Sequence, residues 1–367
     1  MNTTVVSQSG NPFSKNYFSG SACSSNSGKL ARRIFPMLTK LVIVWAAFMG
    51  NQQAYSQFSI AAATVKTWKL GTGSTDWKVA TNWVEGSVPS ATDSVIFPAT
   101  STTQTISNFG GLSMYAITVL GNYTFDVGKT AASFTVTGHL NVAATYTFTL
   151  PKSTSIIFGS STRASLQGVF STENDIVINP GNDVAVGPDG YIVAGLSTTK
   201  FTLSDGATLR IGSTAGIVPG TTNGGAATGN IRFKTLTYGQ SANYIYNGVA
   251  AQNLGEAFPA SILSSGSLTI DNPVSVTVPN TTVRNIGGNL NLLRGNFITN
   301  NKISLGLGQL TATTTLRRAA GVFVGTVQTG NWYNVEYNGS SKTTGDEFSG
   351  TGLRNLAVNL NGGDTLY

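Results

Sequence analysis

Short runs of alternating apolar and polar residues, separated by turn-forming residues, recur through the middle of this chain. Alternation with a period of two is typical of β-strands that bury one face. No stretch after residue 60 sustains the 3.6-residue apolar spacing of an amphipathic helix. The sequence therefore predicts an all-β fold of many short strands, six of which are Ser133–Thr137, Tyr146–Leu150, Ser155–Phe158, Asp175–Ile178, Lys200–Leu203 and Thr208–Ile211.

The spacing of the runs distinguishes between β architectures. Leu268–Ile270 and Leu290–Leu292 are 22 residues apart. Earlier runs are 21, 21 and 25 residues apart, as marked by Val136, Ile157, Ile178 and Leu203. Such periods are typical of solenoids, in which each coil stacks on the last and extends one apolar interior. We predict a right-handed parallel β-helix (β-solenoid). The alternative is a row of tandem β-sandwiches of about 100 residues each, for which the chain lacks the Cys…Trp…Cys pattern.

A longer repeat of about 90 residues begins near residue 240. Ala242–Gly248 recurs as Trp332–Gly339, which places Tyr246 and Tyr337 91 residues apart. Each copy continues with a loop that contains glycine and an acid, and then with an aliphatic strand. The chain stops partway through the second copy. We therefore expect an N-terminal piece of a longer protein, because an open solenoid exposes an unpaired edge.

Residues 1–56 predict a polar tail followed by a secretory signal peptide. A cationic cluster that ends at Lys40 precedes the ten-residue apolar run Leu41–Gly50, and small residues at positions 54 and 56 precede Gln57. A membrane anchor is the alternative, but a span needs about 20 apolar residues. The prediction is export to the cell surface or the medium, with no stable membrane span after cleavage. Either Met1 or Met37 is the start.

Removal of this leader changes the charge and the cysteine count. The leader holds five of the 22 cations and none of the 15 acids, so 17 cations remain and the net charge falls from +7 to +2. The basic character of the whole chain is then no argument for a nucleic-acid partner. The single cysteine, Cys23, also lies in the leader. We expect no disulfide and no thiolate metal site in the rest of the chain.

A tryptophan-rich segment opens the exported part. We expect residues 57–110 to form an N-terminal cap and residues 111–367 to form the solenoid repeats. Trp68, Trp77 and Trp83 lie within 16 residues. Large aromatic side chains near a chain end can close the open mouth of a solenoid core. The alternative is that these three residues contact glycans, since aromatic faces stack on sugar rings.

Several segments carry a family resemblance. Gly206–Ile217, Tyr244–Gly248 and Gly287–Phe297 resemble repeats in very large adhesin-like surface proteins of Gram-negative bacteria, which are often cargo of a type IX secretion system. Trp68–Ile96 resembles the Trp-rich opening of many bacterial β-solenoid proteins. The resemblance covers most of residues 66–367. It implies export and a solenoid, and it brings no catalytic residues to transfer.

The inventory of reactive side chains is poor. His139 is the only histidine, so a Ser-His-Asp triad would have to use it, and no Gly-x-Ser-x-Gly elbow is present. Metal sites built from several His or Cys ligands are excluded for the exported part. The glycine-rich stretch Gly220–Gly229 lacks the Gly-Lys-Ser/Thr ending of a phosphate loop. We expect no cofactor.

The acids offer one alternative to a non-catalytic role. A glycosidase needs two carboxylates that face each other across a groove. Asp175, Asp183 and Asp189 come closest to a cluster, and Arg163 and Lys200 are the nearest cations that a lyase could use. The neighbouring Asn and Gly residues favour turn capping at these acids, with weak calcium binding as a smaller alternative.

The Arg317–Arg318 pair is interpreted as a solvated turn. The prediction from the whole sequence is a secreted or cell-surface, adhesin-like repeat protein that is not an enzyme. Its polar solenoid surface would make weak contacts with glycans or other surfaces, and repetition would supply avidity. The alternative is a β-helix polysaccharide lyase or glycoside hydrolase.

Overall fold

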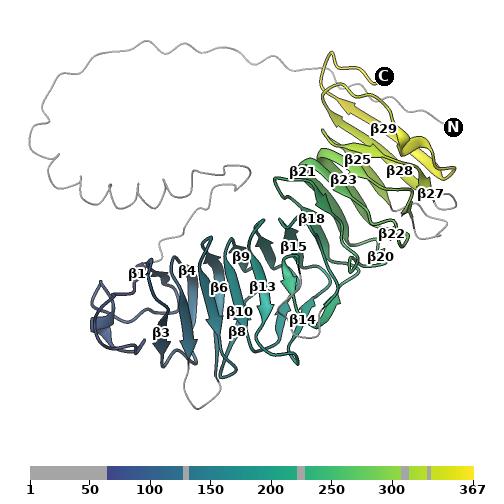
Figure 1. The fold of residues 1–367 in the computed structure, drawn as a ribbon. Helices are drawn as coiled ribbons and strands as arrows, with labels where there is room; N and C mark the ends of the chain where they lie inside the picture. The colour runs from purple at the N-terminus through teal and green to yellow at the C-terminus, as the bar shows by residue number, and fades with distance from the viewer. Residues whose placement is uncertain (1–63, 127–131, 221–227, 307–313, 329–331) are drawn as a thin grey trace, which may run out of the picture. The chain divides into compact units, whose positions relative to one another are not determined.

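The computed structural model describes residues 64–126, 132–220, 228–306, 314–328 and 332–367, which form a β-solenoid (Figure 1). All ladders between its strands are parallel, and within these ranges the helices are two 3-10 turns, Ala80–Asn82 and Asp346–Phe348. The predicted all-β solenoid is confirmed. Tandem sandwiches, which are built from antiparallel sheets, are excluded. The predicted tail and signal peptide, residues 1–56, lie outside the described residues, as does most of Gly220–Gly229.

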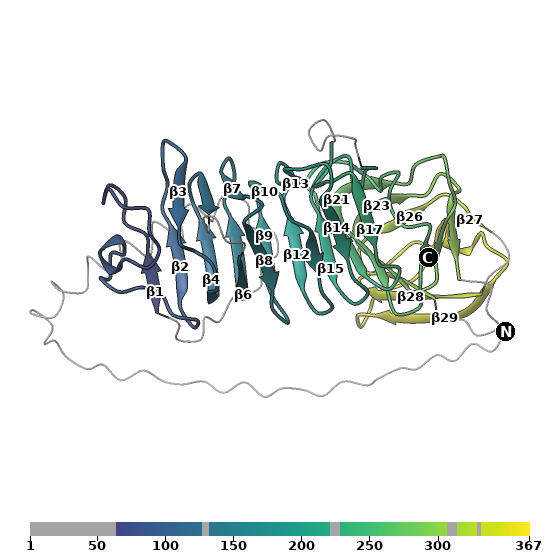
Figure 2. The ribbon, with the colours of Figure 1, turned by 90° about the horizontal axis from the view of Figure 1, so that it is seen from below.

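One sheet runs through the whole solenoid, and we call it the long sheet. Figure 2 shows several of its strands side by side, among them β2, β4, β6 and β12. In order of pairing, its strands are β1 (Val65–Thr67), β2 (Ser94–Phe97), β4 (Ser113–Val119), β6 (Ala132–Val142), β9 (Arg163–Leu166), β12 (Asp183–Val186), β15 (Thr208–Ile211), β18 (Asn243–Tyr246), β21 (Ser267–Thr277), β23 (Asn289–Ile298), β25 (Thr315–Arg318), β28 (Tyr333–Gly339) and β29 (Leu353–Leu360). Three further strands pair with its longer members: β8 (Thr154–Phe158), β19 (Gln252–Asn253) and β26 (Val322–Val324).

Shorter sheets close the other sides of the coils. The second sheet contains β3 (Gln104–Ser107), β5 (Tyr123–Asp126), β7 (Thr147–Leu150), β10 (Val169–Thr172), β13 (Tyr191–Ala194) and β16 (Ile231–Arg232). The third contains β11 (Ile176–Ile178), β14 (Lys200–Leu203) and β17 (Thr235–Tyr238). The fourth, in the later coils, contains β20 (Ser261–Ile262), β22 (Arg284–Ile286), β24 (Ile303–Leu305) and β27 (Val327–Gln328).

The register confirms two of the four spacings read from the sequence. Leu268 pairs with Leu290 and Ile178 pairs with Leu203, 22 and 25 residues later. One equivalence was wrong by a residue, because Val136 pairs with Phe158 and not with Ile157. The reason lies in which face of β8 is buried. Phe158 points into the core, whereas Ile157 points outward and is 46% exposed.

Aromatic side chains fill the first coils. Trp68, Trp77 and Trp83 are all buried, and edge-to-face contacts join Trp83 to both of the others, with ring centroids 5.1 and 4.5 Å apart. Phe97 packs against this cluster and starts a chain of ring contacts along the core. The three tryptophans therefore extend the apolar interior to the N-terminal end of the described coils.

The long repeat is visible as two equivalent tyrosines. Tyr246 on β18 and Tyr337 on β28 are fully buried, and each packs near a phenylalanine of the following loop. Those phenylalanines, Phe258 and Phe348, lie 6.3 and 6.1 Å from the tyrosines, measured between ring centroids. The 91-residue recurrence thus corresponds to the same local packing four strands further along the long sheet.

Candidate binding surface on the long sheet

The outward side of the long sheet carries two continuous rows of mostly polar side chains. They result from alternation, because the intervening residues of each strand point into the core. The first row is Ala116, His139, Arg163, Asp183, Thr208, Asn243, Ser267, Asn289, Thr315, Asn334 and Asn355. The second is Thr118, Asn141, Ser165, Ala185, Arg210, Ile245, Thr269, Asn291, Arg317, Glu336 and Ala357. We call these two rows the outward ladder.

Side chains of the outward ladder bond from coil to coil. Neighbouring strands lie about 4.8 Å apart, which brings equivalent side chains within hydrogen-bond reach. Three such bonds are Ser267 Oγ to Asn243 Oδ1 at 2.7 Å, Asn291 Nδ2 to Thr269 Oγ1 at 3.1 Å and Asn355 Nδ2 to Asn334 Oδ1 at 2.8 Å. The surface therefore repeats hydroxyl and amide groups in fixed positions along the stack of coils.

The candidate acids do not form one group. Asp183 lies on the outward ladder, where Arg210 of the next coil binds it through two nitrogens, with Nε 2.9 Å from Oδ1 and Nη2 2.7 Å from Oδ2. Arg163 stands opposite Asp183 on the preceding strand.

The other two acids belong to different segments of that coil. Asp175 precedes β11 and accepts the backbone N–H of Lys200 at 2.8 Å, and Asp189 is exposed in the turn after β12. Within the described residues, no three His, Cys, Asp or Glu side chains are grouped to hold a metal ion.

His139 is part of the outward ladder. Its ring lies edge-on to Tyr115, with centroids 5.5 Å apart and Nε2 3.4 Å from the tyrosine hydroxyl. Partial burial lowers the pKa of the His139 imidazole, and the charge of Arg163 on the next coil lowers it further. At neutral pH the ring is therefore uncharged and is held by an aromatic neighbour.

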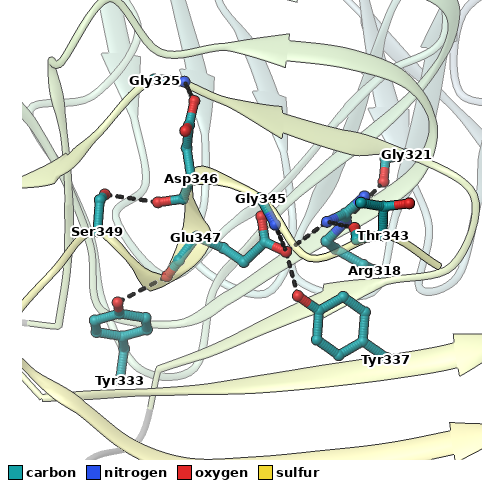
Figure 3. A network of polar contacts seen from close by, with 10 residues as sticks. All are labelled: Arg318, Gly321, Gly325, Tyr333, Tyr337, Thr343, Gly345, Asp346, Glu347 and Ser349. Carbon is teal, nitrogen blue, oxygen red and sulfur yellow. Dashed lines mark hydrogen bonds and ion pairs between the residues drawn. The ribbon is translucent and has the colours of Figure 1, made fainter. Parts of the chain in front are cut away.

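Beneath the last part of the ladder lies a buried ionic network (Figure 3). Arg318 is 4% exposed and Glu347 is 0% exposed, so the interpretation of Arg317–Arg318 as a solvated turn was wrong. The pair lies on β25, where alternation sends Arg317 outward and Arg318 inward. Arg318 donates to Glu347 Oε1 and to the carbonyls of Gly321 and Thr343. The charges of the two arginines suggested that both are exposed. The alternation of side chains along β25 places Arg318 in the core.

Two tyrosines connect this network to β28. Tyr337 donates to Glu347 Oε1, and Tyr333 donates to the backbone carbonyl of Glu347 at 2.8 Å (Figure 3). Burial raises the pKa of the Tyr337 hydroxyl, and the nearby Glu347 carboxylate raises it further, so the tyrosine remains a donor. Because Tyr333 and Tyr337 alternate with Asn334 and Glu336, the network holds from below the strand that presents the ladder.

A second buried network consists of amides. Gln252 Nε2 donates to the carbonyls of Ile211 and Ser213 at 2.8 and 2.9 Å, and its Oε1 accepts from Gly248 N–H and Asn272 Nδ2. Asn272, which is fully buried, also donates to the carbonyl of Ala250. This amide network satisfies backbone groups at the corner of the coils where β15 and β18 end.

Glu336 is the acid of the ladder above the ionic network. Its Oε2 accepts from Arg317 Nε at 2.9 Å, and its Oε1 accepts from Asn338 Nδ2 at 3.0 Å. Burial by itself would raise the pKa of Glu336, but these hydrogen bonds and the charge of Arg317 outweigh it and bring the pKa below its usual value. A carboxyl held ionised in this way is poorly suited to act as a general acid.

The three tryptophans proposed as a cap or as glycan contacts are too buried to offer a ring face to a ligand; each is 4% exposed or less. Trp332 differs, because it is 41% exposed. The sequence had marked Trp332 only as a member of the long repeat. Trp332 immediately precedes the buried Tyr333, and side chains alternate along an extended strand, so Trp332 points outward. This alternation is the feature of the sequence from which its exposure could have been predicted.

Comparisons with known proteins found a match to a family model that covers part of the chain. A family model described as a domain of unknown function (DUF8693) matches residues 67–175, which covers the Trp-rich segment and the coils up to β10. No curated protein and no solved structure matches the chain. A search of the described residues found no helix long and apolar enough to cross a membrane.

Proposed function

We propose that this chain is an exported, surface-exposed repeat protein that binds glycans without cleaving them. The observation that carries the proposal is the outward ladder, a row of amide and hydroxyl groups repeated on successive coils. Each coil would contribute a weak contact, and the sum over many coils would give useful affinity. Amides and hydroxyls both donate and accept, which suits the hydroxyl groups of sugars.

The state of the acids on the ladder supports binding over hydrolysis. Asp183 and Glu336 are each paired with an arginine of an adjacent coil, Arg210 and Arg317. Glycoside hydrolysis requires one carboxyl that is protonated at working pH and a second opposite it. Both carboxylates of the ladder are bonded to arginines, and the lowered pKa of Glu336 makes it a poor proton donor, so these acids are suited to fixing the surface.

Export is supported by the sequence alone. The cationic cluster, the apolar run Leu41–Gly50 and the small residues before Gln57 match the order of a signal peptide. The resemblance of Gly206–Ile217 and Gly287–Phe297 to repeats of adhesin-like surface proteins points to the same location. An adhesin-like role would use the ladder directly, with glycans of another surface as the partner.

The test measures retention and turnover together. The purified chain is incubated with a panel of soluble and insoluble polysaccharides, and the supernatant is assayed for new reducing ends and unsaturated products. The proposal expects retention on at least one polysaccharide with neither product. Release of either product would contradict it and make Asp175, Asp183 and Asp189 the first residues to replace. Absence of both retention and turnover would also contradict it.

A further inference from the structure

Trp332 is the described tryptophan whose ring reaches solvent, and it lies at the edge of the outward ladder. It directly precedes β28, two residues before Asn334. Tyr333 between them points into the core and is fully buried. Because side chains alternate along an extended strand, Trp332 and Asn334 lie on the same outward side, about 6.6 Å apart along the chain.

A β-bulge on the neighbouring strand provides this ring with a partner. Tyr333 pairs with Leu353 and Asn334 pairs with Asn355, so Arg354 is an extra residue on β29. Bulges re-aim side chains, and here the guanidinium carbon of Arg354 lies 4.9 Å from the centre of the Trp332 ring. The cation–π contact restrains the indole while the ring stays 41% exposed.

Polar groups of the ladder follow Trp332 on its own strand and lie on the next strand. The amide of Asn355 donates to that of Asn334 at 2.8 Å, and both residues are outside the core. Glu336 follows on β28 and is bonded to Arg317, Asn338 and, at 3.4 Å, Asn359. An exposed aromatic ring with several convergent hydrogen-bonding groups matches the composition of small-ligand sites.

We propose that Trp332, Asn334 and Asn355 form a subsite for one pyranose ring of a neutral glycan. The indole supplies a flat apolar face for the C–H face of the sugar. The two amides offer donors and acceptors to its equatorial hydroxyl groups. The assignment rests on the glycan-binding function proposed above and gives it a specific site.

A neutral sugar is assigned because the two amides of the subsite are uncharged and match hydroxyl groups as both donors and acceptors. Arg317 is paired with Glu336, and Arg354 lies against the indole ring. An anionic sugar would draw instead on the Arg354 charge, so tetragalacturonate separates the two assignments.

The strand beneath the subsite is held rigid. Tyr333 donates its hydroxyl hydrogen to the backbone of Glu347, and Tyr337 donates to the Glu347 side chain. These bonds fix the inward side of β28, the strand that carries Asn334. A surface fixed before the ligand arrives loses less conformational entropy on binding.

The experiment compares short oligosaccharides with full-length polymers. Titration calorimetry uses the full chain with cellotetraose, xylotetraose, mannotetraose and tetragalacturonate, and the variants are Trp332→Ala, Trp332→Phe and, as a matched exposed apolar control, Val249→Ala. Val249 is 57% exposed and lies beyond the end of β18. We expect Trp332→Ala to weaken neutral tetrasaccharide binding at least about tenfold, as for a truncated aromatic anchor. Trp332→Phe and Val249→Ala should remain within roughly threefold of the parent.

Tryptophan fluorescence gives an independent readout. A neutral tetrasaccharide should change the emission of the parent chain, and Trp332→Phe should bind while losing that change. If Trp332→Ala and the parent bound the tetrasaccharides with equal affinity and still retained polymer, the subsite would be overturned. The proposal that the outward ladder binds glycans would be unaffected. Tight binding of tetragalacturonate alone would overturn the neutral assignment. Failure of the parent chain to bind any polymer would instead overturn the proposed function.

Discussion

The two copies of the long repeat place the same tyrosine in two chemically different environments. Tyr246 stands opposite Ile211 on the preceding strand, and Tyr337 stands opposite Arg318. The residue before the packed phenylalanine is Ala257 in the first copy and Glu347 in the second. An apolar Ile–Ala combination and a buried Arg–Glu pair therefore occupy equivalent places in one solenoid.

The first copy bonds its buried polar groups mainly through amides, and its buried Arg284 donates to the backbone carbonyl of Glu256 and, among the described residues, is not paired with a buried carboxylate. Gln252 and Asn272 are neutral and bond mainly to backbone groups. Loss of one of these bonds therefore leaves no unpaired charge in the core. The second copy uses a guanidinium and a carboxylate that depend on each other. This fold therefore tolerates an amide network or an ionic network at that place, but the ionic network is sensitive to the loss of a single partner.

The largest expected effect comes from removing one ion of the pair. Glu347→Ala leaves the Arg318 charge buried without a counter-charge, and we expect a loss of about 3–5 kcal/mol in the free energy of unfolding. Urea denaturation measures it. Arg317→Leu, which breaks the exposed pair with Glu336, is the control and should cost about 1 kcal/mol or less.

A second variant converts the second copy into the first. The double variant Arg318→Ile with Glu347→Ala introduces the residues found beside Tyr246 and removes both charges. It should regain more than half of the stability that Glu347→Ala loses, since replacing a buried ion pair by apolar residues is often neutral. A double variant no more stable than the single one would mean that the two copies are not equivalent.

A smaller loss is expected in the amide network. Gln252→Ala removes the partner of Gly248 N–H and of two carbonyls, and we expect a cost of about 2 kcal/mol. Asn291→Ala, on the outward ladder, should stay within about 0.5 kcal/mol of the parent in the same urea titration. If Gln252→Ala cost as much as Glu347→Ala, the contrast between amide and ionic networks would fail.

The smallest effect concerns pH. The folded-state pKa of Glu336 is lowered, so its contribution to stability is present above the unfolded value of about 4.5 and is lost as pH falls through the folded value. Glu336→Gln should flatten that acidic part of the stability curve and leave the curve near pH 7 with the same slope. Urea midpoints measured from pH 7 down to acid unfolding provide the test. An unchanged acid limb would show that Glu336 is not held by Arg317 in solution.

The sequence was most informative where one face of a strand is buried. Alternation predicted β7, β14 and β15 to within one residue, and the 22-residue spacing predicted the pairing of Leu268 with Leu290. It placed Ile157 wrongly, because adjacent isoleucines at 156 and 157 leave the parity of β8 ambiguous.

The candidate site was harder to find, because it depends on the register between distant strands. Neither composition nor spacing shows that His139, Arg163 and Asp183 stand in one row, since each pairing needs the number of residues in the intervening turn. The inward Arg318 was missed because its partner Glu347 is 29 residues away. The exposure of Trp332 was not predicted, because it depends on which of the adjacent aromatic residues, Trp332 or Tyr333, points into the core.

Blocking one side of the solenoid at a time tests whether the outward ladder binds polysaccharide. With Cys23→Ser, the chain has no other cysteine, so Asn291→Cys on the long sheet and Thr149→Cys on the outward side of the second sheet can each carry a bulky maleimide. Polysaccharide retention is then compared before and after labelling. We predict that the label at position 291 weakens retention and that the label at position 149 leaves it unchanged. Loss of retention from position 149 alone would contradict the assignment of binding to the outward ladder.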